Sequence, residues 1–322
     1  MNPFSAIYGA GISLRNRMYD RGSFRSFLLE APVVSVGSIS AGGAGKTPFL
    51  IMLGGLFKQR GIEFNVLSRG YGRRTKGVLL VEPGGTPDEF GDEPLLIARK
   101  LSVPVIVGAD RYAAGKFAEE KFGLQLHLLD DGFQHRRLAR DFDIALISQP
   151  DLKDSLLPGG RLREPLPSLA RASAIVMMDG VESAPIPLLP GGPFRWKVSR
   201  GIIPPNTIDA CLAFSGIARP KNFFADLAKS GLKVVGTREF VDHHQYRATD
   251  VESLLKQAEE LRATAFVTTE KDVVNLGGKV DRLHPLHVVP VEMQFEPAAA
   301  AESPVDQLCA AIRQGNETHV RK

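Results

Sequence analysis

The sequence predicts an α/β protein with a large, mostly parallel sheet unit and a smaller second α/β unit. Three observations lead to this prediction. Short apolar runs alternate with amphipathic stretches between residues 31 and 179, a segment rich in proline and glycine follows at residues 181–206, and a second alternation comes after it. Strands that alternate with helices are typical of a mostly parallel sheet covered by helices.

The expected elements follow this pattern in order. In the first unit, strands are expected at Val33–Val36, Phe64–Leu67, Gly77–Val81, Val103–Val107, Leu126–Leu129, Ile144–Ile147 and Ala174–Met178, and helices at Thr47–Gln59, Glu93–Leu101 and Arg111–Lys121. In the second unit, strands are expected at Cys211–Phe214, Lys233–Val235 and Ala265–Thr268, and helices at Lys221–Lys229 and Val251–Leu261. A strand-like piece at Phe194–Val198 lies in the linker, His287–Phe295 returns beside it as one strand, and Val305–Arg313 closes the chain as a helix.

Composition excludes several classes of protein. With 43% apolar and 24% charged residues, the 322-residue chain has the composition of a globular protein. A net charge of +4 is too small to indicate nucleic acid binding by itself. No apolar run approaches the roughly 18 residues that a membrane span needs, and no signal peptide is visible. Cys211 and Cys309 lie far apart without metal-like spacing, which suits a reducing cytoplasm.

The strongest motif occupies residues 31–49, which read APVVSVGSISAGGAGKTPF. A strand, a loop of small residues and a helix with Pro48 in its first turn follow one another, and proline is tolerated there. Small residues let backbone N–H groups close around phosphate oxygens, and the helix N-terminus adds a favourable dipole. The pattern predicts a phosphate-binding loop (P-loop), with Lys46 on the β- and γ-phosphates and the Thr47 hydroxyl on Mg²⁺. The residues expected to hold ATP are Gly42, Gly43, Ala44, Gly45, Lys46 and Thr47.

Two positions of this loop depart from better-known patterns. The strict pattern G-x-x-x-x-G-K-[ST] has a glycine where this chain has Ser40. Partitioning-type ATPases carry an additional lysine, whose place Ala41 takes here. The loop pattern alone therefore leaves open a glycine-rich turn without nucleotide.

A second motif, DDGFQH, follows the expected strand Leu126–Leu129. Carboxylates at the end of an apolar strand in a P-loop protein hold Mg²⁺ directly or through water. Two adjacent carboxylates also repel each other unless a cation compensates them. Asp130 and Asp131 are therefore expected at a magnesium site, and the alternative is that they cap a turn.

Asp92 and Glu93 open a helix in the segment GDEP. Capping explains acidic residues there, because they interact favourably with the helix dipole. The functional alternative is that one carboxylate accepts a proton from a substrate hydroxyl while the other supports the metal. His243 and His244 follow a strand of the second unit and could orient such a base, and adjacent histidines suit a zinc ion poorly.

Arginines recur beside glycines in two loops, SRGYGRR at residues 68–74 and GRLREP at residues 160–165. Arginine binds phosphate with two parallel hydrogen bonds, so both loops are candidates for contact with a phosphorylated substrate. Solvated loop charge is the alternative for either loop.

The N-terminal segment combines an apolar and aromatic stripe between Phe4 and Tyr19 with a cluster of arginines. A helix that lies on a membrane surface needs such a face, with arginines near anionic lipid. A helix packed on the first unit explains the same composition.

Taken in order, VGSISAGGAGKTP, SRGYGR, GDEP, DDGFQH, GRLREP, FVDHHQY and TTEKD resemble the motifs of the tetraacyldisaccharide 4′-kinases, the lipid A 4′-kinases of Gram-negative bacteria. The resemblance covers nearly the whole chain, and seven motifs in one order are far more specific than a P-loop. The family tolerates a residue other than glycine at the place of Ser40. The resemblance implies a P-loop NTPase-like domain and a smaller α/β domain, joined by a two-stranded linker, with an N-terminal membrane-docking helix.

The resemblance also implies the reaction and its residues. ATP and Mg²⁺ would serve to phosphorylate the 4′-hydroxyl of tetraacyldisaccharide 1-phosphate, which gives lipid IVA in lipid A biosynthesis. Asp92 matches the carboxylate of the family's Asp–His base pair, His243 matches its partner with His244 as the alternative, and Lys46 completes the catalytic residues. The implied magnesium ligands are Thr47, Glu93, Asp130, Asp131 and Gln134, and the implied headgroup contacts are Arg69, Arg111, His135 and Arg163.

The implied organisation has five parts: an N-terminal amphipathic helix (1–30), the kinase domain (31–193), the linker (194–206), the second domain (207–286), and a return strand with a terminal helix (287–322). The enzyme is expected as a monomer at the cytoplasmic face of the inner membrane, without a transmembrane span and without nucleic acid. Two rival interpretations are a P-loop kinase for a soluble sugar or nucleoside, which needs no N-terminal helix, and a partner-binding nucleotide switch, which needs no Asp92–His243 pair.

Overall fold

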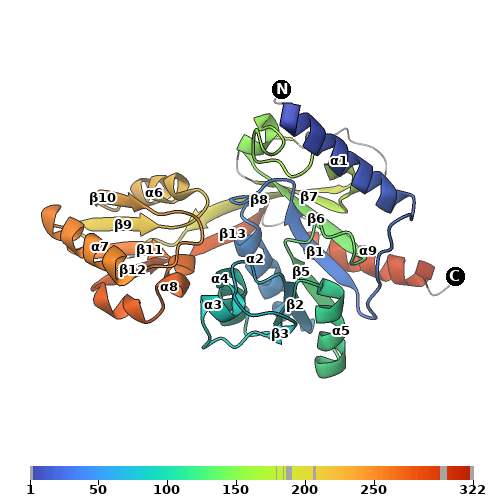
Figure 1. Cartoon of the computed structure of the whole chain (residues 1–322), viewed down its shortest axis with the longest axis horizontal. Coiled ribbons are helices and arrows are strands. Elements are labelled where there is room, and N and C mark those ends of the chain that lie inside the picture. Colours follow the sequence, from blue (N-terminus) through green and yellow to red (C-terminus); the bar gives the residue numbers. More distant parts are fainter. Residues whose placement is uncertain are drawn as a thin grey trace.

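The computed structural model of the protein describes residues 3–178, 180–183, 185, 191–205, 208–297 and 303–319 (Figure 1). Residues 1–2 of the expected N-terminal helix, residue 206 of the expected linker, residue 207 of the second domain and residues 298–302 and 320–322 of the terminal segment lie outside this description. The described residues form two α/β units, each built on its own sheet.

The larger sheet is mostly parallel, as predicted, and has nine strands in the described part of the chain, in the order β13-β8-β7-β6-β1-β5-β2-β4-β3. The antiparallel pairs are β3–β4 and β8–β13. The strands are β1 (Val33–Ser38), β2 (Phe64–Ser68), β3 (Leu79–Leu80), β4 (Val105–Val107), β5 (Leu126–Asp130), β6 (Phe142–Ile147), β7 (Ala174–Met178), β8 (Phe194–Ile202) and β13 (Val291–Glu296). In the centre, β1 pairs with β5 so that Val36 lies opposite Asp130, and the P-loop and the acidic motif therefore follow neighbouring strands.

Helices cover both faces of this sheet. Alternate strand residues point to opposite faces, and apolar side chains on each face pack against helices. Val34 and Leu128 pack on the face of α2 (Lys46–Gln59), α4 (Asp92–Leu101) and α9 (Pro304–His319). Val33 and Leu129 pack on the other face against α5 (Arg111–Phe122). Shorter helices complete the unit, namely α3 (Pro87–Phe90), η1 (Gln149–Lys153) and η2 (Leu166–Arg171).

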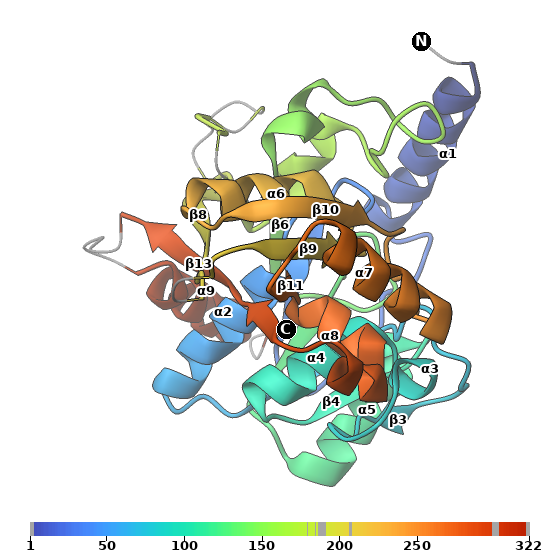
Figure 2. The ribbon, with the colours of Figure 1, turned by 90° about the vertical axis from the view of Figure 1, so that its left-hand side faces the viewer.

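The smaller sheet is entirely parallel in its described strands, in the order β10-β9-β11-β12. Its strands are β9 (Cys211–Ser215), β10 (Val234–Glu239), β11 (Ala265–Thr269) and β12 (Leu286–Val289). Phe223 of α6 (Pro220–Lys229) packs on one face, and Val251 of α7 (Ala248–Glu260) and Leu276 of α8 (Glu270–Leu276) pack on the other, where η3 (Gly277–Arg282) follows. Figure 2 shows this unit in front of the larger one.

The prediction of one strand at His287–Phe295 is wrong. Pro290 lacks the N–H that a continuous strand would use, and the chain changes sheet at this residue. β12 ends before it in the smaller sheet, and β13 begins after it, with Val291 opposite Ile202 of β8. The β8–β13 pair forms one edge of the larger sheet and runs toward the second unit (Figure 1).

The N-terminal helix α1 (Pro3–Asp20) packs on the larger unit along one side only. Ser5 Oγ donates to the Leu156 carbonyl at 2.8 Å, and Tyr8 Oη donates to the Arg163 carbonyl at 3.1 Å. On the other side Ile7 and Leu14 are 71% and 60% exposed. Among the described residues, no helix has the length and apolar character to cross a membrane.

Candidate active site

The predicted P-loop lies between β1 and α2 and borders a large cavity between the two units. Three of its glycines, Gly42, Gly43 and Gly45, have positive φ angles of 68°, 71° and 78°, a region that side chains disfavour. All the residues expected to hold ATP, including Lys46 and Thr47, line this cavity of about 1130 Å³. The loop therefore faces a space that both units enclose.

Gly37 brings the acidic motif to the P-loop. A Cβ atom at this position would lie 2.5 Å from Phe133 Cβ and 2.6 Å from the Phe133 backbone nitrogen. Because real Cβ atoms do not approach other atoms so closely, only glycine lets the segment after β5 lie against the end of β1. This approach places Asp130 and Asp131 beside Lys46, within the same cavity.

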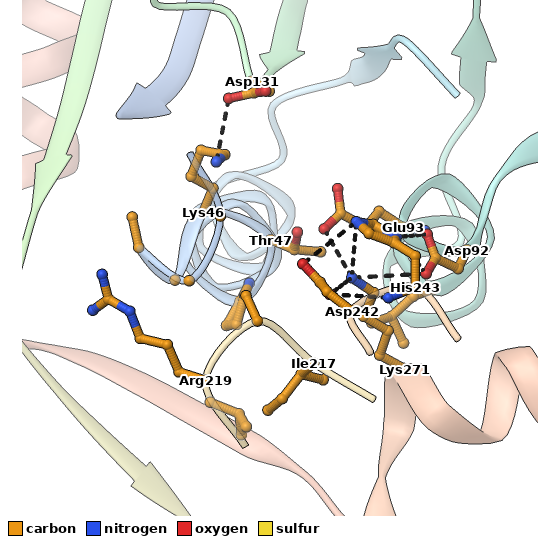
Figure 3. A pocket seen from close by; sticks show the side chains of 18 of the residues that line it. Lys46, Thr47, Asp92, Glu93, Asp131, Ile217, Arg219, Asp242, His243 and Lys271 are labelled. Carbon is orange, nitrogen blue, oxygen red and sulfur yellow. Dashed lines mark hydrogen bonds and ion pairs between the residues drawn. The ribbon is translucent and has the colours of Figure 1, made fainter. Parts of the chain in front are cut away.

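The two adjacent aspartates have opposite electrostatic environments. Asp131 is ion-paired with Lys46 at 3.3 Å and with Arg163 at 2.8 Å (Figure 3 shows the Lys46 pair), and these cations outweigh its burial and lower its pKa. Burial, followed by repulsion from Glu93 and Asp131, raises the pKa of Asp130 to about 7. Ser68 donates to Asp130 Oδ2 at 2.8 Å, but the buried Asp130 Oδ1 has no hydrogen-bond partner.

The Asp92 carboxylate and the His243 imidazole meet across the two units. Gly91, at a φ angle of 89°, allows α4 to start against the turn at residues 70–71, since a Cβ there would lie 2.9 Å from the Tyr71 carbonyl oxygen. His243 Nδ1 lies 2.8 Å from Asp92 Oδ2 and 3.0 Å from Oδ1. His243 has a φ angle of 60°, a backbone conformation that is uncommon outside glycine and clusters at functional sites.

The two side chains shift each other's pKa in opposite directions. Burial alone would raise the pKa of Asp92, but the His243 hydrogen bond and the Lys271 charge lower it to about 2. Burial alone would lower the pKa of His243, but its hydrogen bond to Asp92 raises it. Asp92 therefore stays ionised at neutral pH, as a proton acceptor must.

Lys271 joins the same cluster, as Figure 3 shows. Its Nζ lies 3.4 Å from Glu93 Oε1, 3.2 Å from Asp242 Oδ1 and 3.5 Å from His243 Nε2. Its motif, TTEKD, contributed only to the family resemblance, and Lys271 was not among the expected site residues. Asn275, which donates to Asp92 Oδ2 at 3.1 Å, was missed entirely. Its only signal was its spacing, one helical turn after Lys271.

His244 lies away from Asp92. Its Nε2 lies 3.0 Å from Asp250 Oδ2, and its ring stacks on Phe240 with centroids 4.7 Å apart. The structure thus brings His243, the first of the two expected candidates, into the cavity and directs His244 into the second unit.

The four residues expected at the lipid headgroup are not equally placed. Arg69 and Arg163 line the cavity. Arg111 is buried near Asp130. His135 is half-buried, and this burial, followed by the nearby Arg111 charge, lowers its pKa to about 4. Neither Arg111 nor His135 lines the cavity.

The residues fit a magnesium ion that keeps waters and phosphate oxygens among its ligands. The described residues contain no group of three or more histidine, cysteine or acidic side chains able to enclose a metal. Magnesium bound with a nucleotide needs only one or two carboxylates from the protein. The unpartnered Asp130 Oδ1 and the Thr47 hydroxyl in the first turn of α2 suit it. Gln134 suits it less, because Arg163 donates to its Oε1 at 3.3 Å.

Comparisons with known proteins agree on one family. The profile of a family described as "Tetraacyldisaccharide-1-P 4′-kinase" matches residues 1–310. The tetraacyldisaccharide 4′-kinase of Koribacter versatilis is 49% identical over 327 residues, which cover 98% of this chain and all of that protein. The enzyme of the same name from Aquifex aeolicus is 38% identical over 293 residues, covering 86% of this chain and 89% of that protein. A crystal structure of LpxK from Aquifex aeolicus in complex with ATP superposes with a TM-score of 0.77 at 34% identity, covering 96% of this chain and 97% of that one.

Proposed function

Because this chain belongs to the tetraacyldisaccharide-1-phosphate 4′-kinase family, we propose that it transfers the γ-phosphate of ATP to the 4′-hydroxyl of tetraacyldisaccharide 1-phosphate and forms lipid IVA. The chain is an ATP-dependent kinase of lipid A biosynthesis. The observation that carries the proposal is the Asp92–His243 pair, which lines the same cavity as the P-loop.

Asp92 is the proton acceptor in this proposal. Its carboxylate takes the proton of the 4′-hydroxyl as the oxygen forms a bond to the γ-phosphorus and the bond from that phosphorus to the β,γ-bridging oxygen breaks, so that ADP leaves. His243 holds Asp92 through Nδ1 and shares the charge that the proton brings. The two side chains act as one coupled unit.

Charge neutralisation supplies the rest of the catalysis, because phosphoryl transfer depends on positioning and electrostatics more than on covalent chemistry. Lys46 would leave Asp131 to reach the β- and γ-phosphates, while the P-loop amides and the start of α2 hold the phosphate oxygens. Magnesium, held by Thr47, Asp130 and either Glu93 or Asp131, would neutralise the developing charge on the phosphates.

The acceptor is a lipid, and α1 is proposed to dock the enzyme at the cytoplasmic face of the inner membrane. The exposed apolar side chains of α1, including Phe4, Ile7 and Leu14, supply a surface for lipid. Arg69 and Arg163 in the cavity wall supply cations for the headgroup phosphate.

Transfer of labelled γ-phosphate from ATP tests this function directly. In detergent micelles, we expect labelled product with tetraacyldisaccharide 1-phosphate and none with glucosamine or nucleosides. A Lys46→Ala variant, matched by Lys58→Ala at the far end of α2, should lose at least about 100-fold in rate. Labelled soluble acceptor without labelled lipid would instead favour the soluble-sugar kinase, and ATP hydrolysis without any labelled acceptor would favour the nucleotide switch.

A further inference from the structure

The surroundings of Asp92 are built by the other unit. Asp92 opens α4 of the larger unit, yet in the described part of the chain the side chains that donate to it belong to the smaller one: His243 and Asn275. Within its own unit, the backbone N–H of Glu93 donates to Oδ1 at 2.9 Å. The carboxylate of the proposed base is therefore oriented from across the cavity.

Helix α8 supplies two of the groups around this carboxylate. Lys271 and Asn275 are four residues apart, so they lie on one face of the helix, one turn from each other. Asn275 Nδ2 lies 3.1 Å and Lys271 Nζ 3.7 Å from the same atom, Asp92 Oδ2. Asn275 is buried, and the Lys271 side chain is only 14% exposed, so solvent weakens neither contact much.

These donors leave the carboxylate little freedom. An ionised carboxylate has about four lone-pair sites. The Glu93 N–H, the His243 ring and the Asn275 amide use at least three of them, and they engage both carboxylate oxygens. The carboxylate is thereby fixed in one rotation about its side chain, with about one site left to receive a proton.

We propose that Lys271 and Asn275 of α8 are positioning residues, which hold the Asp92 carboxylate and the neighbouring Glu93 in the orientation that phosphoryl transfer requires. The inference rests on the proposed role of Asp92. In this proposal α8 does more than connect the two units, because its packing against α4 aligns the Asp92 carboxylate that accepts the proton. Lys271 contacts Asp92, Glu93 and Asp242 together and so sets the spacing of three carboxylates with a single charge.

The competing role for Lys271 is direct contact with the phosphates of ATP, since it lines the cavity. The two roles predict different changes in kcat and in the KM for ATP. A positioning residue acts on the alignment of the base, so its loss lowers kcat and leaves the KM for ATP nearly unchanged. A phosphate ligand contributes binding energy, so its loss raises the KM and the Kd for ATP.

A double-mutant cycle tests the proposal in the full-length enzyme, with tetraacyldisaccharide 1-phosphate as acceptor. Asn275→Leu and Lys271→Met should each lower kcat roughly 10-fold to 100-fold, the range for loss of a hydrogen bond to a charged group. Lys271→Arg should restore part of the rate. In an Asp92→Asn background, the same two substitutions should change the residual rate less than about twofold, because the group they position no longer acts.

A matched control lies on the same helix pair. Lys100 of α4 forms an ion pair with Glu270 of α8, the residue beside Lys271, and does not contact Asp92. Lys100→Met therefore removes an ion pair between the same two helices. Because Lys100 also lines the cavity, the variants are compared at saturating ATP, where we expect Lys100→Met to keep kcat within about threefold. Equal losses in Lys100→Met and Lys271→Met would show general docking of α8 and overturn the proposal.

The remaining outcomes distinguish a wrong assignment of the base, Asp92, from a wrong assignment of the positioning residues, Lys271 and Asn275. If Asp92→Asn keeps the wild-type rate, the proposed base itself is wrong. If Asp92→Asn is slow but Asn275→Leu and Lys271→Met are fast, or act equally in both backgrounds, only the positioning role is wrong. A raised Kd for ATP in Lys271→Met, measured by equilibrium binding, with kcat unchanged, would identify a phosphate ligand instead.

Discussion

At the scale of single residues, the site separates its carboxylates by the partners it gives them. Asp131 is neutralised by Lys46 and Arg163, whereas Asp130 faces Glu93 and keeps one oxygen unpartnered. Asp92 is held ionised by the second unit. Asp131 can therefore release Lys46 to the nucleotide, Asp130 can take a cation, and Asp92 can accept a proton.

The buried His127 gives a prediction about how stability depends on pH. It is fully buried, with Nδ1 2.6 Å from Asn65 Oδ1 and Nε2 3.3 Å from Glu119 Oε1, and burial lowers its pKa more than Glu119 raises it. Below pH 6.5, its ordinary pKa, the unfolded chain then binds this proton more readily than the folded chain does. The stability that neutral His127 supports is therefore lost as the pH falls below about 6.5.

We expect the free energies of unfolding of the wild type and of His127→Gln, obtained from thermal unfolding, to approach each other as the pH falls. Between pH 7.5 and pH 5.5, the free energy of unfolding of the wild type should fall more steeply than that of the variant, by less than about 1.4 kcal/mol per pH unit. Parallel stability curves for the two proteins would contradict this expectation.

Residues in local motifs could be predicted from the sequence, and residues that act through tertiary contact could not. The P-loop, Asp92 and the DDGFQH segment each follow or open an element whose pattern is visible locally. Lys271 and Asn275 lie on a helix of seven residues, too short for a periodic pattern, and their role depends on how α8 docks on α4. The choice between His243 and His244 likewise depends on a left-handed backbone at His243 that the pattern does not reveal.

At the scale of elements, the β8–β13 pair and α1 show where patterns were misleading and where they were incomplete. Trp196 and Val198 are both buried, at alternate positions of β8, because this strand lies between β7 and β13 in the larger sheet. The surrounding prolines and glycines suggested a linker, within which only the shorter strand piece Phe194–Val198 was expected. For α1, the sequence left two interpretations open, and the helix shows features of both: polar contacts along one side and exposed apolar side chains on the other.

The exposed face of α1 gives a prediction about membranes. Leu14→Asp places a charge where an apolar side chain would enter the lipid interface, so binding to vesicles that contain anionic lipid should fall at least about tenfold. Leu255→Asp on α7, a matched change at another exposed leucine, should leave binding unchanged. Cosedimentation with vesicles measures both, and equal binding by Leu14→Asp and wild type would remove α1 from the membrane contact.

At the scale of the whole molecule, each unit contributes part of one site. The larger unit supplies the P-loop, the acidic motif and Asp92, and the smaller unit supplies His243, Lys271 and Asn275. Arg219 of the smaller unit also donates to Ser148 Oγ at 3.0 Å on the other side of the P-loop (Figure 3 shows Arg219). In the proposed mechanism neither unit alone has a complete site, so activity depends on the contact that brings His243 and α8 against Asp92 of α4.

The most direct test of the central claim is the rate of lipid phosphorylation at saturating ATP for Asp92→Asn, His243→Gln and the double variant. A proton acceptor and the partner that orients it act as one unit. We therefore predict losses of about 10²- to 10⁴-fold for each single variant, little further loss in the double variant, and an unchanged Kd for ATP. Single variants within about threefold of the wild-type rate, or losses that multiply in the double variant, would contradict the account of a shared site across the two units.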